Sequence, residues 1–128
     1  KNICPVCHKP LTIGVLGRLE ELADRPSGYQ PKNAPGFKKL VELDKIIAEA
    51  LNIKNRQALA VRKEYCSLIE RFGSELYILL ELDLKRKDLG INKRIIQGIK
   101  RVRAGKLAIT PGFDGQYGEI KIFAEDNF

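Results

Sequence analysis

The chain has 128 residues, and its 23 Lys and Arg outnumber 16 Asp and Glu to give a formal net charge of +7. Its three cysteines and its lack of a long apolar run exclude a disulfide-stapled scaffold and a transmembrane helix within this sequence, so we expect a soluble cytoplasmic protein without membrane contact. The length allows one domain with a moderate core, and the positive charge favours nucleic acid or another polyanion as a partner.

The first motif is Cys4-Pro5-Val6-Cys7, which is half of a zinc knuckle. Structural zinc is tetrahedral and is usually bound by two Cys-x-x-Cys pairs, but this sequence contains one. Cys66 lies far along the chain in a segment that is typical of a buried helix, and His8 is too close to Cys7 to join both cysteines without strain. We therefore predict that Cys4 and Cys7 are metal ligands of a partial zinc site, whose other pair lies upstream of Lys1 in a longer protein.

Two alternatives for these thiols stay open. The three cysteines can be ordinary side chains of a reduced intracellular domain, or two copies of the chain can share one zinc ion and form a dimer. The expected cofactor is zinc, in a partial site that can be empty in this chain.

Helical spacing of apolar residues begins after the knuckle. It predicts an amphipathic helix over residues 15–24, which Pro26 prevents from continuing. Residues 25–37 are rich in Pro and Gly and have no apolar period, so they predict a long loop. Helical spacing resumes at Leu43, and a further helix is expected to follow Asn55.

The remaining elements are predicted from caps and from a change of period. Gly73 fits a helix C-cap and Ser74 fits the N-cap of the next helix, and short helices are expected up to Gly105. In residues 106–128 the apolar period becomes two, which predicts a β-hairpin. Its glycine-rich connection, residues 111–118, lacks the Gly-Lys-Ser/Thr ending of a phosphate-binding loop, so we interpret it as a structural or interdomain loop.

An internal repeat relates residues 51–61 to residues 89–99 without gaps. In each copy a helix is expected to end on Leu, an Ile to anchor a tight turn, and a new helix to begin. This pattern resembles the tandem helix-hairpin-helix domains of nucleotide-excision nucleases. Amides at the start of the new helix are unsatisfied donors, and the helix dipole adds positive charge, so a DNA phosphate fits there. The residues that we expect to bind DNA are Lys54, Arg56, Gly90, Asn92, Lys93 and Arg94.

The hairpins depart from the usual glycine pattern. Only Gly90 remains, and Asn52, Lys54 and Asn92 occupy the other places, which makes the first hairpin the weaker phosphate binder. An ordinary helical bundle with solvated basic turns stays open as an alternative. The predicted fold is mainly α, with a tandem helix-hairpin-helix-like helical domain, an N-terminal half zinc knuckle and a C-terminal β-hairpin. Its predicted parts are 1–13 (half zinc knuckle), 14–42 (helix and Pro/Gly-rich loop), 43–105 (helical domain) and 106–128 (β-hairpin and tail).

A resemblance to a known family runs over nearly the whole chain. The segments that carry it are 4–7, 12–16, 21–26, 46–51, 72–75 and 111–122. Together they resemble the C-terminal region of the endonuclease Q family of PHP-domain DNA repair proteins, which are sometimes labelled UvrD-like helicases. The segment around Ala23 and the closing hairpin are its most specific parts.

The resemblance implies a parent enzyme that nicks DNA 5′ to deaminated bases and at abasic sites. It implies an upstream, metal-bearing PHP domain as a partner within the same protein, and a four-cysteine zinc site whose second pair is Cys4 and Cys7. The only histidine of this chain is His8, so we expect no catalytic residues and no enzymatic activity in this fragment. The expected function is that of a DNA-binding accessory fragment; the alternative is a structural or protein-interaction domain that docks the nuclease domain or a partner such as a helicase or clamp.

Overall fold

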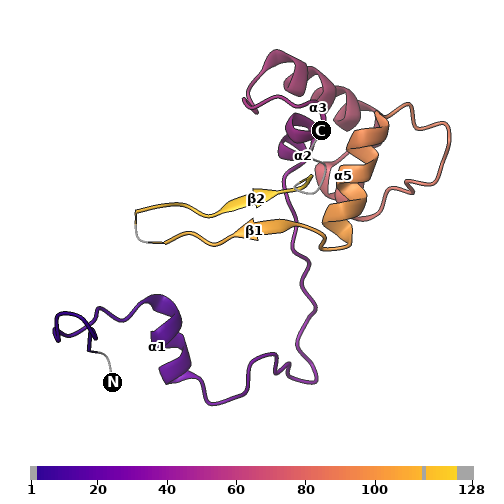
Figure 1. Cartoon of the computed structure of the whole chain (residues 1–128). Helices are drawn as coiled ribbons and strands as arrows, with labels where there is room; N and C mark the ends of the chain where they lie inside the picture. The colour runs from indigo at the N-terminus through magenta and orange to yellow at the C-terminus, as the bar shows by residue number, and fades with distance from the viewer. Residues whose placement is uncertain (1–2, 114, 124–128) are drawn as a thin grey trace. The chain divides into compact units, whose positions relative to one another are not determined.

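The computed structural model describes residues 3–113 and 115–123, and the chain divides into two compact units, Lys1–Gly36 and Phe37–Phe128. Within the described residues, the first unit contains one helix, and the second contains four helices followed by a two-stranded antiparallel sheet (Figure 1). This confirms the mainly α fold with a C-terminal β-hairpin. Among the described residues, none of the helices has the length and apolar character needed to cross a membrane.

The first unit contains a tight turn and one helix. An antiparallel bridge between Ile3 and Pro10 closes the turn, and His8 adopts a positive φ of 54° inside it. Helix α1, Val15–Leu22, ends earlier than expected because the chain becomes extended at Ala23, before Pro26 is reached. No residue of α1 is buried.

The second unit is a helical bundle with a β-ribbon. Its elements are α2 (Leu43–Ala50), α3 (Leu59–Phe72), α4 (Glu75–Leu80), α5 (Lys93–Arg103), β1 (Ala108–Thr110) and β2 (Glu119–Lys121). Helix α2 packs against both α3 and α5, and α4 contacts α3 and α5. In the ribbon, Ile109 pairs with Ile120. The ribbon extends away from the helices in Figure 1.

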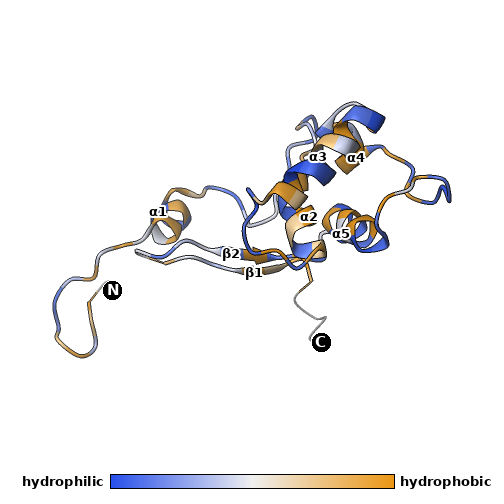
Figure 2. Ribbon diagram, turned by 90° about the horizontal axis from the view of Figure 1, so that it is seen from above, coloured by the Kyte–Doolittle hydropathy of each residue, from blue (hydrophilic) through white to orange (hydrophobic). Residues whose placement is uncertain are grey.

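The core of the second unit is built from aliphatic side chains on the inward faces of the helices, as the composition predicts. Hydrophobic and hydrophilic residues alternate along α2, α3 and α5 in Figure 2. The side chains with the least exposure are Leu43, Ile46, Ile47, Val61, Leu68, Ile78, Ile95, Ile99, Val102 and Ile122. Because Ile122 directly follows β2, the end of the ribbon is anchored in this core, although the strands themselves are largely exposed.

The junction between α3 and α4 follows local cap chemistry. Gly73 ends α3 with a φ of 93°, and its N–H donates to the carbonyl of Ile69. The hydroxyl of Ser74 then accepts the N–H of Tyr77 at 3.2 Å, which satisfies a donor in the first turn of α4. Both predicted caps are confirmed.

The first copy of the repeat ends α2 in a Schellman motif. The N–H of Asn52 donates to the carbonyl of Glu49 at 3.1 Å, and the N–H of Ile53 donates to that of Ala48 at 2.8 Å. Asn52 has a φ of 55°, and its counterpart Gly90 also has a φ of 55°. The two copies thus share a left-handed residue at the same place.

The helices that flank the two turns differ from the expectation. Helix α3 begins at Leu59, because the side chain of Asn55 accepts the N–H of Gln57 at 2.9 Å and forms a separate turn first. No helix ends on Leu89, since α4 stops at Leu80.

The early stop of α4 has a physical reason in the segment that follows it. Leu82 and Leu84 are both buried, and one helix face cannot bury residues at a spacing of two.

Candidate nucleic-acid interface

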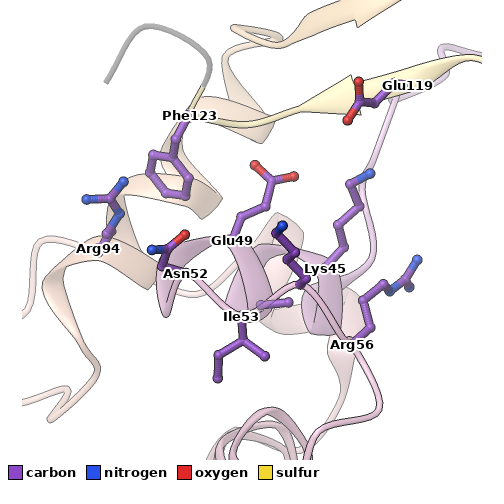
Figure 3. A pocket seen from close by; sticks show the side chains of 10 residues that line it. Lys45, Glu49, Asn52, Ile53, Arg56, Arg94, Glu119 and Phe123 are labelled. Atoms are coloured by element: carbon purple, nitrogen blue, oxygen red, sulfur yellow. The ribbon is translucent and has the colours of Figure 1, made fainter. Parts of the chain in front are cut away.

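An open pocket of about 390 Å³ lies where α2, the first hairpin turn, the start of α5 and the end of the ribbon meet (Figure 3). Its lining is Lys45, Ala48, Glu49, Asn52, Ile53, Lys54, Arg56, Arg94, Glu119 and Phe123. The fold thus brings three of the predicted DNA-binding residues, Lys54, Arg56 and Arg94, into one pocket. Lys45, which sequence reasoning missed, joins them from α2; no sequence signal marks it, because the contact depends on how the first hairpin turn packs beside this helix.

Arg56 is bound by acidic side chains next to the pocket. Its guanidinium donates to Asp44 through Nε at 3.0 Å and Nη2 at 2.5 Å, and Nη2 lies 3.7 Å from a carboxylate oxygen of Glu42. The hydrogen bonds that Arg56 donates to the Asp44 carboxylate raise the pKa of Arg56 above its ordinary value. Arg56 therefore ties the hairpin turn to the start of α2, and much of its charge is compensated there.

Arg94 lies over an aromatic ring. Its guanidinium is 4.8 Å from the centroid of the Phe123 ring, and the guanidinium of Arg101 is 5.4 Å from the same centroid. Such stacking fixes a cation in place. Figure 3 shows the ring of Phe123 beside Arg94 at the edge of the pocket.

Of the predicted residues in the second hairpin, Arg94 lines the pocket, whereas Gly90, Asn92 and Lys93 lie outside its lining. The side chain of Asn92 accepts the N–H of Arg94 at 2.8 Å and so caps α5, and Lys93 is exposed in the first turn of that helix. The carbonyls of Leu89 and Gly90 accept hydrogen bonds from Arg71 of α3. Arg71 holds this turn, and sequence reasoning missed it because the contact joins two distant segments.

Two carboxylates also line the pocket and limit its positive charge. Glu49 accepts the N–H of Ile122 at 2.8 Å and thereby holds the end of the ribbon against α2. Glu119 lies 3.3 Å from the ammonium of Lys121. The pocket thus combines four cations with two anions, which suits a phosphate at its basic side, around Lys45 and Lys54.

The two cysteines of the half knuckle sit in the turn of the first unit. The backbone N–H groups of Cys7 and Val6 donate to the Cys4 sulfur and lower the pKa of its thiol, and so does the Cys7 side chain. The carbonyl of Cys4 accepts the N–H of His8 at 3.0 Å and closes the turn. A turn that favours a thiolate suits a metal ligand, but it supplies only two of the four that structural zinc needs.

No other described residues complete that site. The described parts of the chain contain no group of three or more His, Cys, Asp or Glu side chains that could hold a metal ion. Cys66 lies on α3 as expected, but its side chain is exposed and not buried.

The second unit is a helical domain with a basic pocket beside two similar turns. Comparison with known proteins identifies the family to which the chain belongs. Residues 42–106 match the family model described as the MJ0043 C-terminal domain, and the chain belongs to this family. The uncharacterized protein MJ0043 of Methanocaldococcus jannaschii is 32% identical over 117 residues, which are 91% of this chain and 14% of that protein.

Two solved structures are similar over nearly the whole chain. One is the crystal structure of the lesion-specific endonuclease PfuEndoQ from Pyrococcus furiosus, with a TM-score of 0.74 and 32% identity over 94% of this chain and 29% of that one. The other is endonuclease Q in complex with a 27-mer duplex substrate with an abasic lesion at the active site, with a TM-score of 0.72 and 33% identity over 97% and 30%. The chain thus spans less than a third of each of these relatives.

Proposed function

We propose that the chain is a DNA-binding accessory part of a repair endonuclease of the endonuclease Q type. The observation that carries this proposal is the similarity to an endonuclease Q chain in complex with duplex DNA, at 33% identity over 97% of this chain. A basic pocket beside paired turns supports it, because phosphate contacts supply most of the affinity of such modules. The duplex backbone crosses the basic side of the pocket and the start of α5.

Three lysines are the strongest candidates for phosphate contacts. Lys45 and Lys54 line the pocket and Lys93 begins α5. Among the described residues, no acidic side chain forms an ion pair with any of them. Arg56 acts mainly through Asp44, and Arg94 presents a cation held by Phe123. The helix-hairpin-helix-like turns position these side chains, and the amides at the start of α5 face the phosphate.

The half knuckle has a separate role in this proposal. Cys4 and Cys7 supply the second pair of thiolates of a four-cysteine zinc site, and the first pair comes from the part of the protein that carries the PHP domain. When bound, zinc supplies a rigid link between the two parts. A second copy of the chain is the other source of two thiolates.

We also propose that the chain hydrolyses no phosphodiester bond by itself. Metal-assisted hydrolysis needs a cluster of His and carboxylate ligands, and the sequence contains a single histidine, His8. The hydrolytic residues belong to the PHP domain of the parent enzyme.

The test is a salt titration of binding to a short DNA duplex. Each lost phosphate contact lowers the log–log slope by about 0.9, so Lys54→Gln combined with Lys93→Gln should lower it by about 1.8. The matched control is Lys85→Gln with Lys87→Gln, which removes the same charge from an exposed turn. Equal slopes for the site variant and the wild-type chain, or equal effects of the two double variants, would contradict the proposed contacts.

A second candidate function has its own observation. Helix α1 exposes an apolar stripe, in which Leu16, Leu19 and Leu22 are 69%, 62% and 66% exposed. Exposed stripes of this kind mark protein interaction sites. Absence of measurable binding to DNA at low salt would leave the interaction domain as the leading function.

A further inference from the structure

A second concave surface lies at the other end of α5, where the helix meets the ribbon. Its volume is about 780 Å³, compared with about 390 Å³ for the pocket of Figure 3. Its lining is Gln97, Lys100, Arg101, Ala104, Gly105, Lys106, Leu107, Ala108 and Ile122. We call this surface the α5–ribbon groove.

The lining of the α5–ribbon groove carries only positive charge. Lys100, Arg101 and Lys106 contribute three cations, and no carboxylate is among the lining residues. The pocket at the first hairpin, by contrast, includes Glu49 and Glu119. The groove is therefore the more uniform anion-attracting surface of the two.

The three cations differ in how firmly they are held. The guanidinium of Arg101 donates to the carbonyl of Ile122 at 2.9 Å and lies over the ring of Phe123, so its charge is fixed at the base of the groove. Lys100 and Lys106 are exposed, and no described acidic side chain forms an ion pair with either. These two ammonium groups can change position to contact a bound ligand, whereas the guanidinium of Arg101 is held in place.

The helix terminus does not oppose an anion strongly. A helix C-terminus carries roughly half a negative charge, but here the last turn is capped. The N–H of Gly105 donates to the carbonyl of Val102 at 3.0 Å, and the N–H of Lys106 donates to that of Arg101 at 2.9 Å. The positive charges of Lys100 and Lys106 outweigh what remains, and the small residues Ala104 and Gly105 leave room for a bulky backbone to approach.

We propose that the α5–ribbon groove binds the sugar-phosphate backbone of duplex DNA as a second contact beyond the hairpins. Lys93, Gln97 and Lys100 are all exposed at spacings of four and three, so they share one face of α5. Lys93 and Lys100 are about 10 Å apart along the helix axis, at 1.5 Å per residue. This inference rests on the proposed function, because the same duplex contacts both ends of α5.

The experiment compares three double variants in the salt titration of duplex binding. Lys100→Gln with Lys106→Gln should lower the log–log slope by about 1.8, so that between about 50 and 200 mM salt it loses about twelvefold less affinity than the wild-type chain. Lys54→Gln with Lys93→Gln reports on the hairpin contacts, and Lys85→Gln with Lys87→Gln controls for net charge. Thermal melting should be the same for all, because every substituted side chain is exposed.

The outcomes separate the two proposals. A lower slope for the Lys100/Lys106 variant than for the Lys85/Lys87 control supports the groove. An unchanged slope for the groove variant beside a lower slope for the hairpin variant overturns the groove and leaves the proposed function in place. No binding by the wild-type chain, or unchanged slopes for both site variants, overturns both proposals.

Discussion

Arg103 is predicted to be the most important single cation for the stability of the second unit. Its Nε donates to the carbonyl of Leu79 at 2.8 Å, and its Nη2 donates to those of Ile78 and Leu82 at 3.0 and 2.9 Å. Carbonyls in the last turn of a helix have no partner within it, so this one side chain satisfies the end of α4 and joins it to α5. Replacing it with Ala removes all three hydrogen bonds.

The size of the loss follows from these bonds and their surroundings. A hydrogen bond to a charged group contributes about 1.5–3 kcal/mol when it is buried. Here the bonds are only partly buried, and water can replace the guanidinium at the freed carbonyls. We therefore expect Arg103→Ala to lower the free energy of unfolding by about 2–3 kcal/mol in total, and the midpoint of thermal unfolding by about 10–20 °C.

Urea unfolding, followed by circular dichroism, measures this loss. Arg103→Lys should recover part of the stability, because one ammonium cannot reach three carbonyls with the geometry of the guanidinium. The matched control is Arg62→Ala, which removes the same charge from an exposed position on α3. A loss below about 0.5 kcal/mol for Arg103→Ala, or an equal loss for Arg62→Ala, would refute the reasoning. Arg103→Ala should leave the salt slope of DNA binding unchanged, because this cation is engaged with α4.

Two further predictions concern the turns. Asn52→Val should lower the free energy of unfolding by about 1–2 kcal/mol, because a β-branched residue is strained at positive φ. Asn52→Gly should leave it unchanged, because Gly adopts this conformation without strain. Urea unfolding of both variants measures the difference, and equal losses would contradict the prediction. With metal removed, Cys4 should react with iodoacetamide at neutral pH faster than Cys66, because its lowered pKa favours the thiolate. Mass spectrometry over time measures the two rates. Equal rates would contradict the stabilisation of a thiolate at Cys4.

The features that the sequence predicted well depend on neighbouring residues. The caps at Gly73 and Ser74 are decided within a few positions, so pattern and propensity suffice for them. The alternating tail likewise predicts the ribbon, because period two is a local signal. The mainly α class follows from the same local rules.

The features that could not be predicted from the sequence depend on contacts between distant segments. The end of α4 depends on Arg103, which lies more than twenty residues further on, as the separations of 21 to 25 show. The hydrogen bonds from Arg56 to Asp44, twelve residues earlier, were not predicted either. The α5–ribbon groove exists only because the ribbon returns to α5, and no spacing of Lys100 and Lys106 shows this in advance.

The hydrogen bond from the N–H of Ile122 to the side chain of Glu49 spans 73 residues. During synthesis, the core of the second unit is therefore incomplete until Ile122 has left the ribosome. Loop closure over such a distance is slow compared with helix formation. The helices therefore form first, and part of their apolar surface stays exposed until the ribbon packs against it. A ribosome that stalls just before the ribbon, or a protease that trims it, leaves a protein with every helix present and its core exposed.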